Sequence, residues 1–264
     1  MNYTGQPLKI SVITAVHNRV HTIEQALASV QSQTWTQVEH VVIDGASTDG
    51  TLAVLQAHKD TIAVLISEKD AGIYDALNKG LTQVTGDVVG LMHSDDFFAS
   101  NQVLEKVAAA FADPAVDGVY ADLDYVAKDE TNRIIRRWRA GKYNPRKLAW
   151  GWMPPHPTLY LRRSVIEQWG GFDASFRIAA DYDAMLRYLA KGEIHLAYIP
   201  EVLIKMRVGG ESNRSLTRIA CKSREDYRAL RKNDVGGLAS LIWKNISKIG
   251  QFLPSVQSHR EGER

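Results

Sequence analysis

Cysteine is almost missing from this sequence. Cys221 is the only one among 264 residues, so the chain cannot form an internal disulfide. The first residues do not resemble a secretion signal, and nothing else in the sequence indicates an oxidising compartment. We therefore expect a cytoplasmic protein.

Long apolar runs are also missing. The hydrophobic stretches are interrupted within about ten residues, whereas a membrane-spanning helix needs roughly 20. With 45% hydrophobic and 23% charged residues, the composition is that of a soluble globular protein with one sizeable core. We expect no membrane-spanning segment.

Glycine is absent from the turn after the first predicted strand. A β-branched run at 9–16 predicts that strand, and apolar residues at helical spacing predict a helix at 22–32. Dinucleotide-binding enzymes need glycines in this turn, because the pyrophosphate approaches the backbone there. The intervening His17, Asn18 and Arg19 therefore argue against a nicotinamide or flavin enzyme.

Short strands and amphipathic helices alternate through the first hundred residues. The pattern predicts further strands at 39–43, 63–67 and 88–92, with helices at 47–58 and 73–84. This alternation is typical of an α/β fold, with a Rossmann-like, mostly parallel central sheet and helices on both faces. Ligands of such sheets bind at the carboxyl ends of the strands.

The second half of the chain is less regular. It predicts helices at 102–111, 163–169 and 181–191, strands near 118–125 and 158–162, and a basic hairpin at 133–147. Residues 1–213 carry 21 basic and 25 acidic residues, a net charge of −4, whereas residues 214–264 carry 11 and 5, a net charge of +6. We expect one domain at 1–213, with halves 1–100 and 101–213, followed by a basic helical tail at 214–264.

Acidic side chains follow the predicted strands. Asp44 ends the second strand, where its carboxylate can accept hydrogen bonds from a base or a ribose. Asp49 follows in a turn whose residues suit helix capping. Asp75 and Lys79 lie four residues apart on one helix face, so they either pair with each other or present charge to a nucleotide.

Asp95 and Asp96 follow the strand at 88–92. Two adjacent carboxylates repel each other unless a cation or hydrogen-bond donors neutralise them. Their oxygen atoms suit Mg²⁺ or Mn²⁺ that bridges a diphosphate. The sequence therefore predicts a divalent cation at this strand end.

Three segments, DGASTDGT, SEKDAGIYDALNKG and HSDD, resemble in their order and spacing the inverting family 2 glycosyltransferases with the glycosyltransferase A fold. The resemblance covers about residues 8–213 and is greatest to the bacterial enzymes that build O-antigen and exopolysaccharide repeat units. It implies a catalytic domain with a nucleotide-sugar half and an acceptor half. It also implies a donor held by Thr14, Ala15, Asn18 and Asp44.

The same resemblance implies Asp95 near the ribose or sugar and Asp96 on the metal. Many relatives have an acid in place of His93, so we expect water and phosphate oxygens to complete the shell of Asp96. His93 is then a packed or hydrogen-bonded neighbour of the site. Arg207 precedes a loop where relatives often carry a basic residue or a histidine, and it is a candidate for neutralising the leaving diphosphate.

In the family, the acid that matches Asp181 is the general base. Inversion needs one carboxylate that removes the proton of the acceptor hydroxyl as it attacks the anomeric carbon. Asp183 points about 200° around the helix from Asp181, so we assign it a structural role. His156 either hydrogen-bonds an acceptor sugar or caps the proline-rich turn around it.

The basic tail carries an amphipathic pattern at 238–254. Trp243 borders an apolar stripe, and Lys244 and Lys248 lie four residues apart. Such a helix either lies on an anionic membrane surface or packs on the catalytic domain or a second subunit.

We therefore expect a metal-dependent, inverting hexosyltransferase that uses Mg²⁺ or Mn²⁺. Its expected partners are a nucleoside diphosphate sugar, with UDP the first choice, a glycan or lipid-linked glycan acceptor and an anionic inner membrane face, but no nucleic acid. A nucleotidyltransferase would need a glycine-rich, basic first loop. A non-catalytic sugar-nucleotide-binding or assembly protein would have no reason to retain Asp44, Asp95, Asp96 and Asp181 together.

Overall fold

The computed structural model describes residues 7–208 and 216–242 of the chain. Its first half alternates parallel strands and helices. The strands are β1 (Ile10–Val16), β2 (Val38–Asp44), β3 (Val64–Ser67) and β4 (Val88–Leu91). The helices are α1 (Ile23–Gln31), α2 (Thr51–Ala57) and α3 (Ile73–Gln83), with a 3₁₀ turn η1 (Lys59–Thr61) after α2. Every strand and helix predicted for this half is present.

The second half mixes strand directions. Its strands are β5 (Phe97–Phe98), β6 (Gly118–Val126), β7 (Ile134–Trp138), β8 (Tyr160–Arg162) and β9 (Leu196–Arg207). Its α-helices are α4 (Val103–Ala110), α5 (Arg163–Trp169), α6 (Ala180–Leu186) and α7 (Leu216–Lys232). Shorter turns are η2 (Pro145–Trp150), η3 (His156–Thr158) and the π-helical η4 (Arg187–Lys191).

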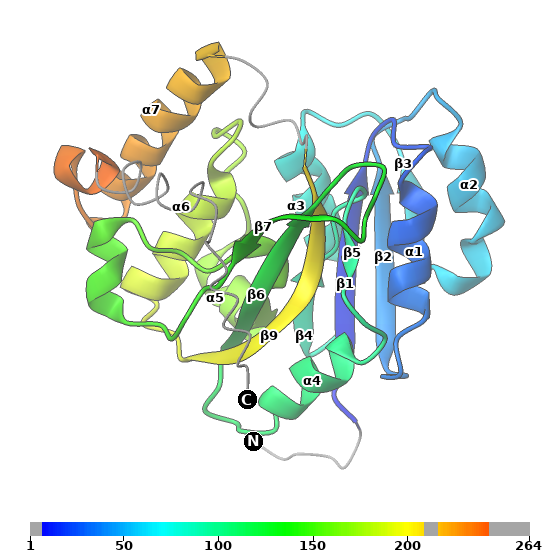
Figure 1. The fold of residues 1–264 in the computed structure, drawn as a ribbon, viewed down its shortest axis with the longest axis horizontal. Coiled ribbons are helices and arrows are strands. Elements are labelled where there is room, and N and C mark those ends of the chain that lie inside the picture. The colour runs from blue at the N-terminus through cyan, green and yellow to red at the C-terminus, as the bar shows by residue number, and fades with distance from the viewer. Residues whose placement is uncertain (1–6, 209–215, 243–264) are drawn as a thin grey trace, which may run out of the picture.

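The described strands form one sheet with the order β3-β2-β1-β4-β8-β6-β9-β5, and β7 pairs with β6 beside this path. α1 and α4 pack on one face of the sheet, and α3 packs on the opposite face. Figure 1 shows α1 and α2 at one end of the molecule and α6 and α7 at the other. The predicted α/β class with helices on both faces is confirmed.

The strand β9 is present where no strand was predicted. Its pairing with β6 shifts register between Ile199, which lies opposite Ala121, and Val202, which lies opposite Asp122. Pro200 falls in this bulge, because proline has no backbone N–H to donate to the ladder. The proline interrupts the alternation that would identify the strand from sequence.

Two other predicted elements differ from the structure. The predicted hairpin at 133–147 is wrong, because β7 pairs with β6 and residues 145–150 form the turn η2. The predicted helix at 181–191 is divided into α6 and the π-helical turn η4. In both cases tertiary packing sets the backbone more strongly than the local pattern does.

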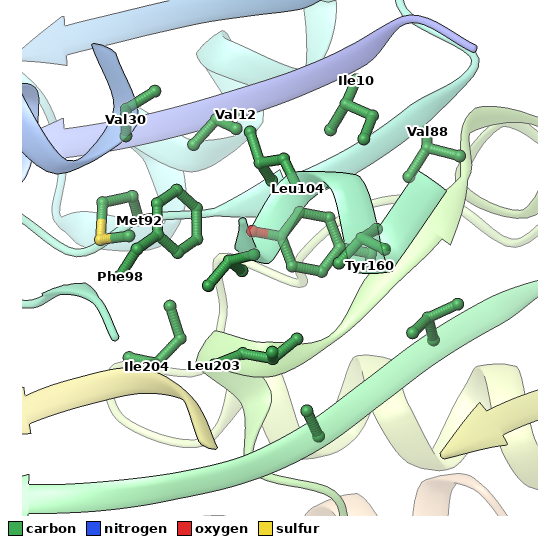
Figure 2. Close-up of a cluster of buried hydrophobic side chains, with 14 of the residues drawn as sticks. Ile10, Val12, Val30, Val88, Met92, Phe98, Leu104, Tyr160, Leu203 and Ile204 are labelled. Atoms are coloured by element: carbon green, nitrogen blue, oxygen red, sulfur yellow. The ribbon is translucent and has the colours of Figure 1, made fainter. Parts of the chain in front are cut away.

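A large part of the core lies between the sheet and α4 (Figure 2). Ile10, Val88 and Leu104 are fully buried there beside the Tyr160 ring. A Cβ at Gly90 would lie 2.1 Å from that ring, so only glycine fits on β4 at this point. Burying each large apolar side chain stabilises the fold by about 1.5–3 kcal/mol. This core fixes β4 and the residues that follow it.

Within the two described ranges, no helix is long and apolar enough to cross a bilayer. The loop after Arg207 falls outside those ranges from residue 209 onward, as does most of the amphipathic pattern predicted at 238–254. The described part of the basic tail includes α7, which packs against α6.

Candidate functional site

The carboxyl ends of β1, β2 and β4 lie side by side, because β1 pairs in parallel with both neighbours. Asp44 ends β2 and is fully buried. Its carboxylate accepts hydrogen bonds from the backbone N–H of Ser47, at 3.2 Å, and from the hydroxyl of Ser67, at 2.6 Å. Asp44 therefore sits at the predicted strand edge, held by groups from the two adjacent turns.

The three other predicted donor residues near β1 differ in their surroundings. Thr14 is fully buried, with its hydroxyl 3.0 Å from His40 Nε2, and Ala15 is also buried. Asn18 has a φ of 52° and accepts the N–H of Thr48 at 2.8 Å. Its side chain thus links the turn after β1 to the turn after β2.

Charged residues surround the start of α3. Asp75 accepts the N–H of Ala71 at 2.9 Å and lies 3.6 Å from the Lys79 ammonium group. Lys79 lies closer to Glu68, at 2.8 Å. The predicted pair of Asp75 and Lys79 is thus present, and the exposed Glu68 joins it.

Asp70 was given no role from the sequence. One of its carboxylate oxygens is buried and has no hydrogen-bond partner among the described residues. A Cβ at Gly45 would lie 2.6 Å from the other oxygen, so Asp70 is close to the turn after Asp44. Burial raises the pKa of Asp70. A polar oxygen without a partner is a candidate contact for a ligand at this edge.

Asp96, in the segment after β4, contacts Arg207 at the end of β9. Asp96 is 1% exposed, and its Oδ1 accepts the backbone N–H of Arg207 at 3.1 Å. The Arg207 guanidinium donates to the backbone carbonyl of Asp95 and to Gln25 Oε1, and it stacks over Phe97. The structure therefore brings together the predicted metal ligand and the predicted neutralising cation.

The Asp96 carboxylate can be tested as a cation ligand. Burial and the adjacent Asp95 raise the pKa of Asp96 well above its ordinary value. Its Oδ2 is buried without a hydrogen-bond partner, so this oxygen has no ligand from the described residues. Among the described residues, no three His, Cys, Asp or Glu side chains converge on one point. Asp96 thus fits a cation that takes its other ligands from phosphate and water.

A chain of side chains joins the end of β4 to the start of α6. His93 Nε2 lies 2.9 Å from His156 Nε2, and His156 Nδ1 lies 3.2 Å from Asp181 Oδ2. Asp181 Oδ1 accepts a hydrogen bond of 3.1 Å from the Tyr74 hydroxyl. The side chain of His156 therefore contacts Asp181 and does not cap the proline-rich turn.

Burial determines the protonation of this chain. It lowers the pKa of His93, and it lowers the pKa of His156 to about 4. A neutral His156 that donates from Nδ1 to Asp181 keeps a lone pair on Nε2, so His93 donates from its own Nε2. Burial acts to raise the pKa of Asp181, but His156, the Tyr182 N–H and other neighbours lower it overall. Asp181 is then an ionised carboxylate at neutral pH.

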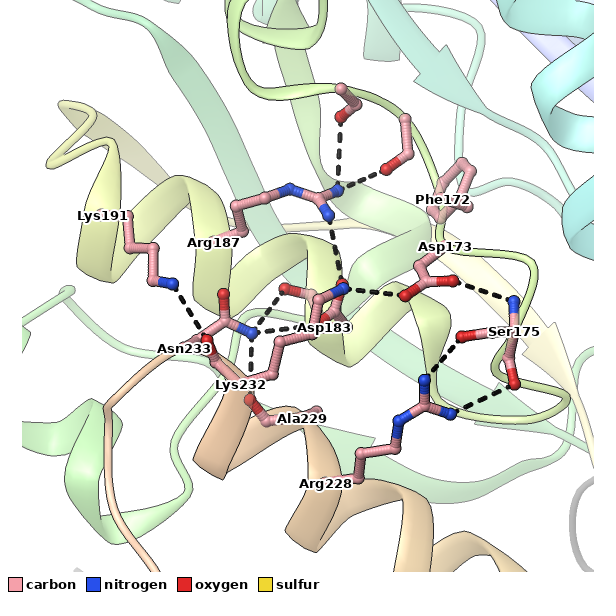
Figure 3. Close-up of polar contacts among 12 residues, drawn as sticks. Phe172, Asp173, Ser175, Asp183, Arg187, Lys191, Arg228, Ala229, Lys232 and Asn233 are labelled. Carbon is pink, nitrogen blue, oxygen red and sulfur yellow. Dashed lines mark hydrogen bonds and ion pairs between the residues drawn. The ribbon is translucent and has the colours of Figure 1, made fainter.

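Asp183 has a different environment from Asp181. It is fully buried and lies 3.2 Å from Arg187 and 3.0 Å from Lys232, while Asn233 donates to it at 2.9 Å (Figure 3). A carboxylate enclosed by two cations and an amide has no oxygen left for a substrate. The geometry agrees with the structural role expected for it.

Two neighbouring cavities lie beside α3 and share Leu81 and Phe172 among their lining residues. A cavity of about 50 Å³ with mostly apolar walls, including Leu91 and Met185, reaches His156 and Asp181. A larger hollow of about 590 Å³ lies between α3 and α5, and none of the predicted site residues lines it. The small size of the first cavity agrees with the burial that shifts the pKa values of His156 and Asp181.

Tyr74 was also missed by the sequence analysis. It lies in the segment SEKDAGIYDALNKG, among acidic and basic residues that are more typical of a binding site. Its hydroxyl lies 2.7 Å from the carbonyl of Ile178 as well as 3.1 Å from Asp181. An aromatic residue on a helix is more often a core residue, so its pattern alone does not indicate this contact.

Comparison with known sequences identifies several similar proteins. The sequence model of the family described as Glycosyl transferase family 2 matches residues 11–170. An uncharacterised glycosyltransferase of Mycobacterium tuberculosis is 32% identical over 180 residues, which are 67% of this chain and 68% of the relative. A PGL/p-HBAD biosynthesis glycosyltransferase of Mycobacterium bovis is 27% identical over 208 residues, covering 77% and 78% of the two chains.

Solved structures share the fold. Residues 1–349 of TarS from S. aureus, solved with UDP-GlcNAc, match with a TM-score of 0.66 and 18% identity over 86% of this chain and 66% of that one. The mannosyltransferase PcManGT from Pyrobaculum calidifontis, solved with GDP-Man and Mn²⁺, matches with a TM-score of 0.64 and 20% identity over 94% and 70%. The chain spans 39% of a longer TarS chain.

Acidification from about pH 6.5 to pH 4 should destabilise the protein through His156, whose pKa is lowered to about 4 by burial. Between these pH values the His156 imidazole binds a proton in the unfolded chain but not in the folded protein. The free energy of unfolding therefore falls as the pH falls, by up to about 1.4 kcal/mol per pH unit for this group. Urea unfolding at pH 7, 6 and 5 should show a smaller pH dependence for His156→Gln.

The control for this experiment is His21→Gln, at an exposed position, which should keep the pH dependence of the wild type. The same pH dependence in His156→Gln as in the wild type would mean that His156 is not held neutral by the fold.

Proposed function

This chain belongs to glycosyltransferase family 2 and has the glycosyltransferase A fold, and from that premise we propose that it transfers a sugar from a nucleoside diphosphate sugar to a hydroxyl of a glycan, with inversion at the anomeric carbon. The observation that carries the proposal is the chain His93–His156–Asp181. It connects the strand edge that carries Asp44 and Asp96 to one ionised carboxylate at the start of α6, in the acceptor half.

The donor binds at the carboxyl ends of β1, β2 and β4. Asp44 and Asn18 contact the nucleoside, together with the backbone around Thr14 and Ala15. Asp95 faces the ribose or the sugar. Asp75 and Lys79, at the start of α3, present charge to the same ligand. UDP is the nucleotide we propose first, and the TarS structure with UDP-GlcNAc and the PcManGT structure with GDP-Man support a nucleoside diphosphate sugar.

Asp96, whose Oδ2 is buried without a hydrogen-bond partner, would hold a divalent cation, Mg²⁺ or Mn²⁺. When bound, such a cation stabilises negative charge on a diphosphate. The Mn²⁺ in the PcManGT structure supports this choice of ion. The Arg207 guanidinium donates to the backbone carbonyl of Asp95, next to Asp96. Its positive charge stabilises the negative charge of the leaving group.

Asp181 is the general base. It takes the proton of the acceptor hydroxyl while the hydroxyl oxygen forms a bond to the anomeric carbon, and the bond from that carbon to the diphosphate oxygen breaks. The nucleoside diphosphate leaves with the electron pair of that bond. His156 and Tyr74 hold one carboxylate oxygen each, which orients Asp181. Both ring nitrogens of His156 are engaged by His93 and Asp181, so its contact with the acceptor sugar is through the exposed edge of the ring.

The acceptor that we propose is a glycan carried by a lipid, of the kind used in bacterial surface polysaccharides such as O-antigen, at the cytoplasmic face of the membrane. The relative named for PGL/p-HBAD biosynthesis supports a role in glycan assembly. In the described part of the tail, Leu238 and Ile242 are 65% and 57% exposed. They lie four residues apart on one face, as an interfacial helix requires.

The donor and the metal can be tested together by thermal stabilisation with UDP-, GDP- and dTDP-sugars in the presence of Mn²⁺. A donor bound at 100 times its Kd stabilises the folded protein by about 2.7 kcal/mol, which raises the melting temperature. The shift should disappear on chelation, return with Mg²⁺ or Mn²⁺, and be absent in Asp96→Ala. A full shift in excess chelator would reject the metal role of Asp96.

Asp181→Asn tests the base. The amide keeps the size and one acceptor oxygen of the carboxylate, but it cannot take a proton. Turnover, measured as release of the nucleoside diphosphate, should fall by at least ~10²-fold, while the donor-induced thermal shift stays near that of the wild type. Asp183→Asn is the matched variant two residues away, and its main effect should be on the melting temperature. Near-normal turnover of Asp181→Asn would refute the base assignment.

The membrane role is tested by deleting residues 243–264, which leaves α7 in place. Each basic residue near an anionic surface contributes about 1 kcal/mol, and salt weakens this attraction. Full-length protein should co-sediment with anionic liposomes more than the shortened chain, and less so as salt rises. Neutral liposomes are the control. Equal co-sedimentation of both proteins, with a lower melting temperature for the shortened one, would indicate a docking helix instead.

A further inference from the structure

The helix α7 supplies a carboxylate to the backbone that leads into α6. Glu225 is 9% exposed, and its side chain accepts three backbone N–H groups. Arg177 donates to Oε1 at 3.0 Å, and Ile178 and Ala179 donate to Oε2 at 2.8 and 3.0 Å. One side chain, distant in sequence, thus satisfies three consecutive N–H groups in the segment just before α6.

This contact holds the N-cap residue of α6 and the two residues before it. Ala179 occupies the N-cap position of α6, and alanine has no side-chain acceptor for the first N–H groups of the helix. Glu225 instead accepts the N–H of Ala179 itself and of the two residues before it, so the backbone that enters α6 depends on α7.

The same segment is held from its opposite side. The Tyr74 hydroxyl contacts the carbonyl of Ile178 at 2.7 Å, while Glu225 holds the N–H of the same residue. Tyr74 also contacts Asp181, which follows Ala179 by two residues. Restraints on both the carbonyl and the N–H side leave the Asp181 backbone little freedom to move.

The other end of α7 is anchored to α6 as well. Lys232 lies 2.8 Å from Asp173 and 3.0 Å from Asp183, and Asn233 donates to Asp183 (Figure 3). Nearer the start of α7, Lys222 is one of the groups that lower the pKa of Asp181. α7 therefore contacts or influences α6 over much of its length.

We propose that Glu225 is a positioning residue for Asp181. Through it, α7 contributes to the acceptor half of the site. The inference rests on the proposed function, in which Asp181 is the base. Glu225 acts through the backbone of residues 177–179 and touches no substrate. A carboxylate base loses effectiveness when its oxygen moves by about 1 Å from the attacking hydroxyl, at a cost of about 10²-fold in rate. Residues beyond the family match at 11–170 thus contribute to catalysis.

The variants Glu225→Gln and Glu225→Ala form a graded test. Gln keeps one acceptor oxygen, which can serve Ile178 and Ala179 but leaves Arg177 facing an NH₂ group. Ala removes all three hydrogen bonds. Arg228→Gln is the matched control, because Arg228 lies on the same helix and holds the neighbouring Ser175, at 2.8 Å, without touching the three N–H groups (Figure 3).

The first measurement is amide hydrogen exchange of residues 177–179, which needs no substrate. Exchange should be faster in Glu225→Gln, faster again in Glu225→Ala and unchanged in Arg228→Gln. Wild-type exchange in Glu225→Ala would overturn the proposal.

The second measurement is turnover at a temperature well below the melting point of every variant, on the UDP-, GDP- or dTDP-sugar that the wild type consumes. We expect kcat to fall about 10-fold in Glu225→Gln and about 10²-fold in Glu225→Ala, with donor KM and donor-induced thermal shift unchanged. Loss of donor binding together with kcat would indicate general damage and overturn the positioning role.

Asp181→Asn is measured in parallel to separate the two proposals. An inactive Asp181→Asn with a fully active Glu225→Ala would refute the role of Glu225 and leave the base assignment intact. An active Asp181→Asn would refute the base assignment itself.

Discussion

The contact between His93 and His156 is the interaction on which the proposed chemistry depends. It joins the residue after β4 to the turn before β8, and through Asp181 it reaches the start of α6. The contact requires one imidazole to donate and the other to accept, which two protonated rings cannot do. Burial, which keeps both rings neutral, is therefore a condition for the two halves of the site to meet.

Buried carboxylates impose a second constraint. Removing a carboxylate from water is costly unless donors or cations replace the lost hydration. Asp183 has cations and an amide around it, and Glu225 has three backbone N–H groups. Asp96 differs, because one of its oxygens has no protein partner. The fully paired acids hold the frame, and incompletely paired acids such as Asp96 and Asp70 are the ones suited to bind a ligand.

The sheet explains why residues far apart in sequence reach one place. The four parallel strands bring the ends of β1, β2 and β4 together, as their alternating pattern predicts. Strands β6, β8 and β9, which run in both directions, then bring residues of the acceptor half to the carboxyl ends of these parallel strands. β9 returns Arg207 to Asp96, and the Pro200 bulge lets this strand follow β6 over its full length.

The sequence by itself determined the parallel half of the fold, the family, and the positions of Asp44, Asp96 and Asp181 at element ends. The strands, the helices and the places of these acids follow from local periodicity and from residues that act close to where they stand in the chain, whereas the family follows from the resemblance of three short segments. Only the tertiary structure decided that Tyr74 contacts Asp181, that His156 meets His93, and that Glu225 holds the backbone before α6. Each of these contacts joins residues 46 to 107 positions apart. No local pattern indicates such pairs, because a side chain that serves a distant partner has the same sequence neighbours as one that faces the core or water.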